Sequence, residues 1–567
     1  MILFKPNGSL NVATDPSDLP ETSDGTSIIS EALTRCKNLR LDQKGKLTLR
    51  DGSSKLNASA IDTAIWFLIE QDGFRYTFAG SSIYQNESSI VSSLTSAQWS
   101  AIKYNQFNDT VQQIFALNGT DRKRINGTSV NEWGITPPTS VTTAASTGTG
   151  LTGDYNAKIT YCRKVGSVVV SESNPSPAGT TRSLTNDSLL VSWTASSDSQ
   201  VTHVRVYRTL ADGLIYFHDQ DVAIGTTSVD TATDDDSLGD ELETDHDRPP
   251  LGQFVIGPTF DGTCFIIKDN NLFYCKPRQP EYWPEAFFVE IGPVHFPGKT
   301  AVIYNGQVYV LTKNDIHNVI GTGDGTFLPI PMRARTGAQG MFGAVSVPGY
   351  GIFHTGPDGV YLFSGGQDKN WTDPMFLPIF RGETVNGLPG VADMESAILF
   401  AYGKNLFFCY KSSGKDYPSN VLVLNLDNGR ISYHVYNDGS DIQIRCMATD
   451  DTNKRILIGD STGFVREIED KDETTDSDTA ISWESQSKDF TLQTRAHFPR
   501  WNKYDIDASS STSCTGYLLL DGVVHATHTI TGNRDTRRRL VKEGNGEKCG
   551  IRLSGSGPVS IYAVESE

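Results

Sequence analysis

The arrangement of hydrophobic and polar positions predicts a mostly β protein. Runs of four to seven β-branched and aromatic residues alternate with Gly, Asn and Asp turns along almost the whole chain. Helical periodicity is clearest at Thr26–Cys36, where the apolar residues would share one face, and it is weaker at Ala60–Trp66. We therefore expect strands nearly everywhere and a short helix at 26–36.

One pattern, a turn residue followed by a short aromatic strand, recurs along the chain at Asn271, Gly306, Gly359, Asn405 and Gly463. Propeller blades contain four strands in ~40–50 residues, so this irregular spacing fits a β-propeller with loops of variable length. We predict the main blades at 248–478, and an N-terminal segment with the first blades at 1–137. A pair of unrelated β-sandwiches is the alternative.

The composition changes between these two regions. Thr136–Gly150 is rich in Pro, Thr, Ser and Gly, which is typical of a linker. Short spaced strands follow, with one central Trp193. The strand at 191–193 followed by the one at 204–208 resembles fibronectin type III domains, so we predict an inserted β-sandwich of this type at 138–247. Residues 479–567 are predicted to form a C-terminal β-sandwich or a segment that closes the propeller.

Charge and hydropathy narrow the possible functions. The 567 residues carry a net charge of 49 − 67 = −18, which argues against coating a nucleic acid but permits an acidic passage through which DNA slides. No stretch of 18 apolar residues occurs, so a membrane span is not expected. The N-terminal residues lack the pattern of a signal peptide, so we do not expect Sec secretion.

The sequence offers no convincing catalytic, metal or cofactor motif. The GxGxxG string at 148–153 follows no strand and opens no helix, so we do not expect a dinucleotide site there. The GxSxG string at 459–463 is followed by a strand-like run, which predicts a plain hairpin turn. Acidic runs near 234 and 467 lack the ligand order of a calcium loop. We therefore expect no enzyme activity and no cofactor.

An aromatic pair is a candidate subunit contact. Tyr282 and Trp283 lie between Pro280 and Pro284, and aromatic side chains often anchor interfaces. The alternative is that Trp283 belongs to the core of a blade.

Two charged clusters are further candidates. The basic cluster could dock on an acidic neighbour or contact phosphate, with a solvated hairpin tip as the alternative, and it includes Arg537, Arg538 and Arg539. The acidic cluster could form a solvated loop or face a channel, and it comprises Asp234, Asp235 and Asp236.

Seven segments in order along the chain resemble those of bacteriophage tail nozzle proteins. They are 35–52, 172–177, 205–208, 280–284, 308–312, 356–365 and 551–562. The resemblance implies a β-propeller subunit of a ring, commonly a hexamer, at the distal end of a short phage tail. Such a ring encloses the channel for DNA retention and ejection, docks on an adaptor or portal complex, and could contact tail fibres. It would be a virion component assembled in the host cytoplasm, with no catalytic centre.

Two other functions remain as alternatives. A receptor- or glycan-binding propeller of a tail would bind glycan saturably and form monomers or trimers. A propeller hydrolase would lose turnover when one carboxylate is replaced.

Overall fold

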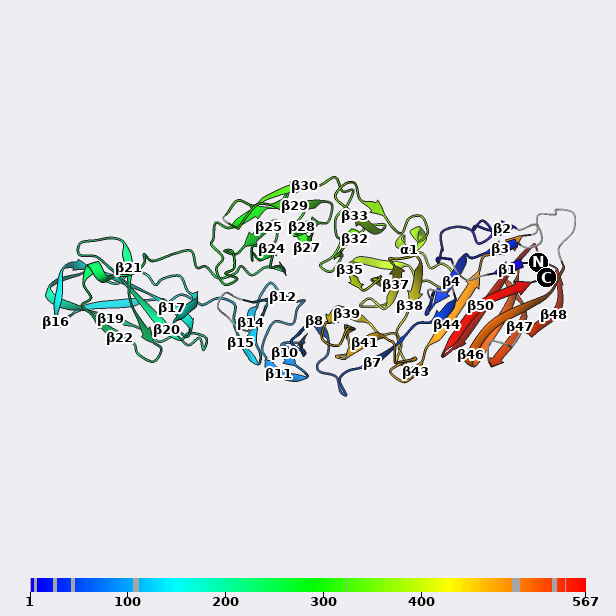
Figure 1. Cartoon of the computed structure of the whole chain (residues 1–567), viewed down its shortest axis with the longest axis horizontal. Coiled ribbons are helices and arrows are strands. Elements are labelled where there is room, and N and C mark those ends of the chain that lie inside the picture. The colour runs from blue at the N-terminus through cyan, green and yellow to red at the C-terminus, as the bar shows by residue number, and fades with distance from the viewer. Residues whose placement is uncertain are drawn as a thin grey trace. The chain divides into compact units, whose positions relative to one another are not determined.

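Strands make up nearly all of the regular structure (Figure 1). The computed structural model describes residues 2–4, 8–23, 28–41, 46–105, 112–323, 325–491, 500–532, 538–545 and 547–566. The helices among them are the short α1 (Leu377–Phe380) and a 3₁₀ turn, η1 (Asp235–Ser237). No helix in these ranges is long and apolar enough to cross a membrane. The prediction of a mostly β protein is confirmed.

The chain divides into two compact units. The first comprises Met1–Ser88, Leu311–Ile316 and Met332–Glu567, and the second comprises Ser89–Val310 and His317–Pro331. Each unit contains four-stranded antiparallel sheets in which consecutive strands are neighbours. This meander is the strand order of a propeller blade.

Three meanders lie wholly or largely in the second unit. They are β12 (Ser100–Tyr104), β13 (Gln113–Leu117), β14 (Arg122–Asn126) and β15 (Ser129–Glu132); β23 (Phe254–Ile256), β24 (Phe265–Lys268), β25 (Asn271–Tyr274) and β26 (Phe288–Glu290); and β27 (Gly298–Tyr304), β28 (Gln307–Thr312), β29 (Ile316–Ile320) and β30 (Leu328–Pro331). One apolar cluster joins β12 and β13 to β23 and β24, so these sheets pack together although about a hundred residues separate them in sequence.

Those intervening residues form the predicted inserted sandwich. Its strands are β16 (Val141–Tyr155), β17 (Ala157–Val165), β18 (Val168–Glu172), β19 (Arg182–Trp193), β20 (His203–Thr209), β21 (Tyr216–Ala223) and β22 (Ser228–Thr231). They make two sheets, ordered β16-β19-β22 and β18-β17-β20-β21, with one shared apolar core. That this sandwich is of the fibronectin type III kind stays a prediction.

The predicted linker at 136–150 is wrong over most of its length. Residues 141–155 form strand β16, which pairs along β19 from Val141↔Trp193 to Tyr155↔Arg182. Val141, Thr143 and Leu151 point into the structure and are buried. Thr is a favourable strand residue, so this composition fits a strand once a partner strand is present.

The remaining meanders lie wholly or largely in the first unit. They are β8 (Ile65–Gln71), β9 (Phe74–Ala79), β10 (Ser82–Gln85) and β11 (Ser88–Val91); β31 (Ala344–Val347), β32 (Gly351–Gly356), β33 (Gly359–Phe363) and β34 (Lys369–Asn370); β35 (Val391–Tyr402), β36 (Asn405–Ser412), β37 (Asn420–Asn425) and β38 (Ile431–His434); and β39 (Ile444–Asp450), β40 (Arg455–Asp460) and β41 (Val465–Asp470). The last set receives its fourth strand from β7 (Gly52–Lys55), which pairs antiparallel with β41. This sheet therefore combines strands from both halves of the chain.

The recurring aromatic strands are β25, β28, β33, β36 and β41. All five are strands as predicted, but β28 and β36 are second in their meander, whereas β25, β33 and β41 are third. Tight hairpins precede both positions, so the same turn-plus-strand pattern arises twice in each sheet. This explains the irregular spacing.

Both ends of the chain add strands to the sheet of the first unit that also contains β35–β38. Its N-terminal strands are β1 (Ile2–Phe4), β2 (Thr22–Ser23), β3 (Ile28–Ser30), β4 (Leu33–Lys37), β5 (Leu39–Leu41) and β6 (Leu47–Leu49). Its C-terminal strands are β44 (Ser482–Ser487), β45 (Phe490–Thr491), β46 (Arg500–Leu520), β47 (Val523–Gly532), β48 (Arg538–Asn545), β49 (Lys548–Ser556) and β50 (Val559–Ser566). Two short strands, β42 (Thr475–Asp476) and β43 (Thr479–Ala480), precede them. β1 pairs with β50, and the two ends lie together in Figure 1.

The expected helix at 26–36 is wrong over the residues that the structure describes. Residues 28–30 form β3, and Leu33–Lys37 form β4, which pairs with β44 in a register that joins Cys36 to Ser485. The partner strand is about 450 residues away, so a sequence window cannot reveal it, and long-range pairing overrides the local helical period. The weaker candidate at 60–66 likewise runs into β8.

Candidate functional site

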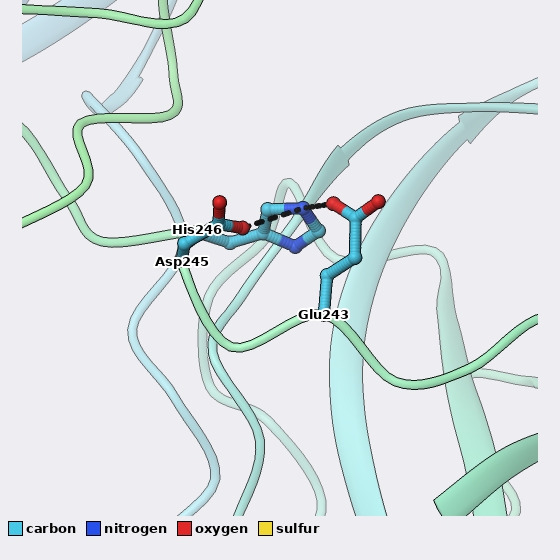
Figure 2. Close-up of side chains that lie close together, drawn as sticks. All are labelled: Glu243, Asp245 and His246. Carbon is cyan, nitrogen blue, oxygen red and sulfur yellow. Dashed lines mark hydrogen bonds and ion pairs between the residues drawn. The ribbon is translucent and has the colours of Figure 1, made fainter. Parts of the chain in front are cut away.

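A His–carboxylate cluster lies where the chain leaves the sandwich. It consists of Glu243, Asp245 and His246, whose possible ligand atoms all lie within 4.8 Å of one another (Figure 2). The His246 Nε2 is 2.9 Å from the Glu243 Oε2 and 4.0 Å from the Asp245 Oδ1. The imidazole is 8% exposed and stacks on Tyr282 with ring centroids 4.0 Å apart. The sequence motifs did not reveal this cluster.

Lys276 already supplies a cation to this cluster. Its Nζ lies 2.6 Å from the Asp245 carboxylate and 3.2 Å from that of Glu243. Partial burial raises the pKa of Glu243, but Lys276 and His246 outweigh it and hold that pKa below its usual value. A metal-binding histidine normally donates its other ring N–H to a partner, and the Nδ1 of His246 has no partner among the described residues. These side chains therefore fit a structural ion-pair network better than a metal centre.

The structure places the predicted aromatic pair inside this chain. Trp283 is 3% exposed, contacts Trp133 edge to face at 5.7 Å, and donates from Nε1 to the carbonyl oxygen of Pro280. Tyr282 is also buried, against His246. The core alternative thus describes Trp283, and the prediction of a subunit contact gains no support from these positions.

The neighbouring Glu281 has a larger role than sequence reasoning gave it. It is 2% exposed, and its carboxylate accepts from Arg163 at 2.7 Å and from the Ser171 hydroxyl at 2.6 Å. Arg163 and Ser171 belong to the sandwich strands β17 and β18, whereas Glu281 lies in the β25–β26 connection. This buried ion pair links the sandwich to the sheet β23–β26. Nothing in the local sequence distinguishes Glu281 from a surface carboxylate, because both of its partners lie more than a hundred residues earlier in the chain.

A second buried ion pair joins distant segments of the first unit. Arg50 and Asp476 have side chains 0% and 2% exposed. Arg50 also donates to the Asn38 amide oxygen and to the carbonyl oxygens of Asp51 and Val435. All five guanidinium N–H groups are thereby used.

The acceptor is equally well satisfied. Asp476 accepts from Arg50, from the Ser53 hydroxyl at 2.8 Å and from the Asn437 backbone N–H at 3.0 Å. The ring of Tyr436 lies under the guanidinium at 4.2 Å. This network ties the N-terminal segment to the end of the meander series.

The acidic candidates divide into an internal anchor and two surface groups. Asp235 accepts from buried Arg208 at 2.6 Å and from the Ala211 backbone N–H at 2.8 Å. Asp234 caps η1, and both Asp234 and Asp236 are exposed. Residues 138–247 contain 16 Asp and Glu against 6 Lys and Arg, a net −10 of the chain's −18. A place for these residues along a channel stays a prediction.

The remaining sequence candidates give little further information. Arg537 lies outside the described residues, and Arg538 and Arg539 begin β48 in a stretch whose side chains are not described. The GxSxG string is the hairpin between β40 and β41, as predicted. The GxGxxG string lies within β16 at a break in its register with β19.

Comparisons with known proteins give no family. No family model matches the chain, and no curated protein matches it. Among solved structures, Hsv2 of Kluyveromyces lactis shares 8% identity over 48% of this chain and 66% of its own, with a TM-score of 0.24. The exo-β-1,3-galactanase of Phanerochaete chrysosporium, solved with galactose, shares 8% identity over 92% of this chain and 100% of its own, with a TM-score of 0.18. At such TM-scores neither likeness carries an argument about function.

Proposed function

We propose that this chain is a structural subunit of a phage tail nozzle, a ring that encloses the channel for DNA retention and ejection. The ring would be a hexamer docked on an adaptor or portal complex. The proposal begins from the ordered resemblance of seven sequence segments to nozzle proteins. It assigns no catalytic step to any residue.

The observation that carries the proposal is the use of buried charge. Arg50–Asp476 and Arg163–Glu281 join segments that lie 426 and 118 residues apart, and each pair is almost wholly buried. A third pair, Arg466–Asp460, is 3% and 2% exposed with a 2.8 Å contact. In each pair the carboxylate is neutralised and hydrogen-bonded within the chain. The first two pairs link segments that are distant in sequence, whereas Arg466–Asp460 links the neighbouring strands β40 and β41. Such links suit a conduit under mechanical load.

The series of meanders supports a propeller body. Seven four-stranded sets follow one another in the described residues, and β7 completes the last of them. We propose that they are blades of the β-propeller kind, since stacked blades bury faces that a single meander cannot bury. The sandwich is inserted after the second set.

The charge of the chain fits a passage for DNA. Six copies would carry 6 × −18 = −108 formal charges. An acidic wall repels phosphates and lets DNA slide without binding. The acidity is concentrated in the inserted sandwich, which carries −10 of each −18.

Mass and shape test the proposal directly. The purified chain would be measured by light scattering and negative-stain imaging, alone and with portal–adaptor complexes of a short-tailed phage. A closed ring, or a monomer that joins the complex as a ring, is the expected result. A monomer or trimer that ignores the complex but binds host surface glycan saturably would replace the proposal with a receptor-binding propeller.

A further inference from the structure

The hairpin between β20 and β21 forms an exposed apolar tip on the sandwich. Leu214 is 91% exposed, Ile215 52% and Leu210 38%. Three aliphatic side chains within six residues thus face solvent, whereas the sandwich core has ample apolar positions of its own. Single exposed aliphatic residues are normal, but a group at one turn is typical of a contact surface.

The tip lies at the end of the sandwich away from Val141, where the chain enters. The register of β16 with β19 places Val141 at one end and Tyr155 at the other. The backbone N–H of Thr209, the last residue of β20, donates to the carbonyl oxygen of Asn156, next to Tyr155. The tip therefore projects beside the β16–β17 turn.

Hydrogen bonds hold the tip in one conformation. Asp212 exchanges bonds with Asp154: its backbone N–H donates to the Asp154 carbonyl, and its carboxylate accepts from the Asp154 N–H, both at 2.9 Å. The Ala211 N–H donates to Asp235, and the Gly213 N–H donates to the Leu210 carbonyl. A preorganised apolar tip loses little conformational entropy when it binds.

Carboxylates surround the tip. Asp212 lies in it, and η1 beside it presents exposed Asp234 and Asp236. Of the nearby cations, Arg208 is 0% exposed and is paired with Asp235, and the Nζ of Lys158 lies 4.7 Å over the ring of Tyr216, so carboxylates outnumber cations at this surface. An anionic membrane would repel such a surface, whereas a protein with basic side chains would attract it.

We propose that the tip Leu210–Ile215 docks into an apolar socket of a partner protein whose rim carries Lys and Arg. Leu214 and Ile215 fill the socket, and Asp212, Asp234 and Asp236 pair with the rim. The inference does not rest on ring formation, because the tip belongs to the sandwich alone.

Site-specific photo-cross-linking tests this contact in the full chain. A benzophenone amino acid replaces Leu214 in the cells that normally make the protein, and a matched chain carries it at Leu328, which is 58% exposed on β30. We expect one protein to be joined at 214 and not at 328. Mass spectrometry should place the adduct in an apolar pocket flanked by Lys or Arg.

Calorimetry with that purified partner then measures the contact. Leu214→Ser should lower affinity at least tenfold, and Leu328→Ser should change it less than twofold. Raising NaCl from about 50 to about 500 mM should lower the affinity of the wild type for the partner. It should lower the affinity of an Asp212→Asn, Asp236→Asn double variant by a smaller factor.

Four results would overturn the proposal. The first is a cross-linked adduct at position 214 no more abundant than that at 328, and the second is adducts formed only with another copy of the chain. The third is equal affinity of Leu214→Ser and the wild type for the partner. The fourth is sedimentation of the chain with phosphatidylglycerol vesicles that depends on Leu214. Ring assembly, measured separately by light scattering, should be unaffected by Leu214→Ser.

Discussion

Removing Arg50 tests whether buried ion pairs hold the modules of the first unit together. Replacement by Met keeps much of the side-chain volume but leaves Asp476 as a buried charge. The Ser53 hydroxyl and the Asn437 N–H remain as its only donors among those described for the wild-type site. The Asn38 and Val435 oxygens lose their guanidinium donors as well.

The loss in free energy of unfolding follows from the hydrogen-bond partners that Arg50→Met removes. Breaking a buried pair by removing one partner costs about 3–5 kcal/mol. Replacing both partners, in Arg50→Met with Asp476→Leu, removes the uncompensated charge. We expect the double variant to recover about 2 kcal/mol relative to Arg50→Met, because isosteric apolar pairs avoid the desolvation cost.

Hydrogen exchange is the suitable assay, because a chain with two units need not unfold in a single two-state transition. Protection of amides in β7 and β41 and of the Asn437 N–H should fall by about two to four orders of magnitude in Arg50→Met. The control is Lys404→Met, which breaks an ion pair whose side chains are 65% and 51% exposed. It should leave protection unchanged.

Two results would refute the reasoning. One is protection in Arg50→Met within tenfold of the wild type. The other is a double variant less stable than Arg50→Met, which would mean that an unpaired Asp476 charge is not the source of the loss.

Three further predictions concern acid stability, thiol reactivity and the aromatic pair. Burial opposes ionisation of Glu469, but His434, Arg50 and Arg40 outweigh it and lower its pKa from 4.5 to about 2. Its contribution of about 3 kcal/mol to the free energy of unfolding is therefore complete above pH 4.5 and disappears as pH falls toward 2. In Glu469→Gln the midpoint of urea unfolding should depend less on pH over that range, and an unchanged dependence would contradict this. Burial raises the pKa of Cys36 from 9.0 to about 12, so at pH 8 its thiolate fraction is about a thousandfold below that of an ordinary thiol, and iodoacetamide should label it only after unfolding. Trp283→Ala should cost about 3–5 kcal/mol, measured by urea unfolding, because a 3% exposed indole leaves a cavity; intact stability combined with lost ring assembly would instead restore the subunit contact.

Local sequence signals predicted the strands that have local partners. A hairpin before β25 or β33 is specified within about ten residues, by its turn residues and the alternating run that follows them. A short sequence window therefore contains all the information that is needed. The insertion at 138–247 was also recognisable, because its composition differs from the segments on both sides. These features depend on neighbours in sequence.

The candidate sites were less predictable for the same physical reason. Glu281 and Asp476 look like ordinary turn or surface acids until Arg163 and Arg50 arrive from distant strands. Burial of Trp283 depends on Trp133, which precedes the inserted sandwich. A charge or a ring acquires its role from its environment, and here that environment is built by segments more than a hundred residues away.

The sequence by itself determined the strand-rich class, the hairpins and the acidity of the chain, because backbone propensity, turn chemistry and net charge are properties of short segments or of composition. Only the tertiary structure decided that Leu33–Lys37 is a strand, that the Thr-rich stretch at 141–155 is not a linker, and that β7 completes the last meander. Each of these outcomes requires a partner strand from elsewhere in the chain, and the hydrogen bonds of that pairing outweigh the local preference.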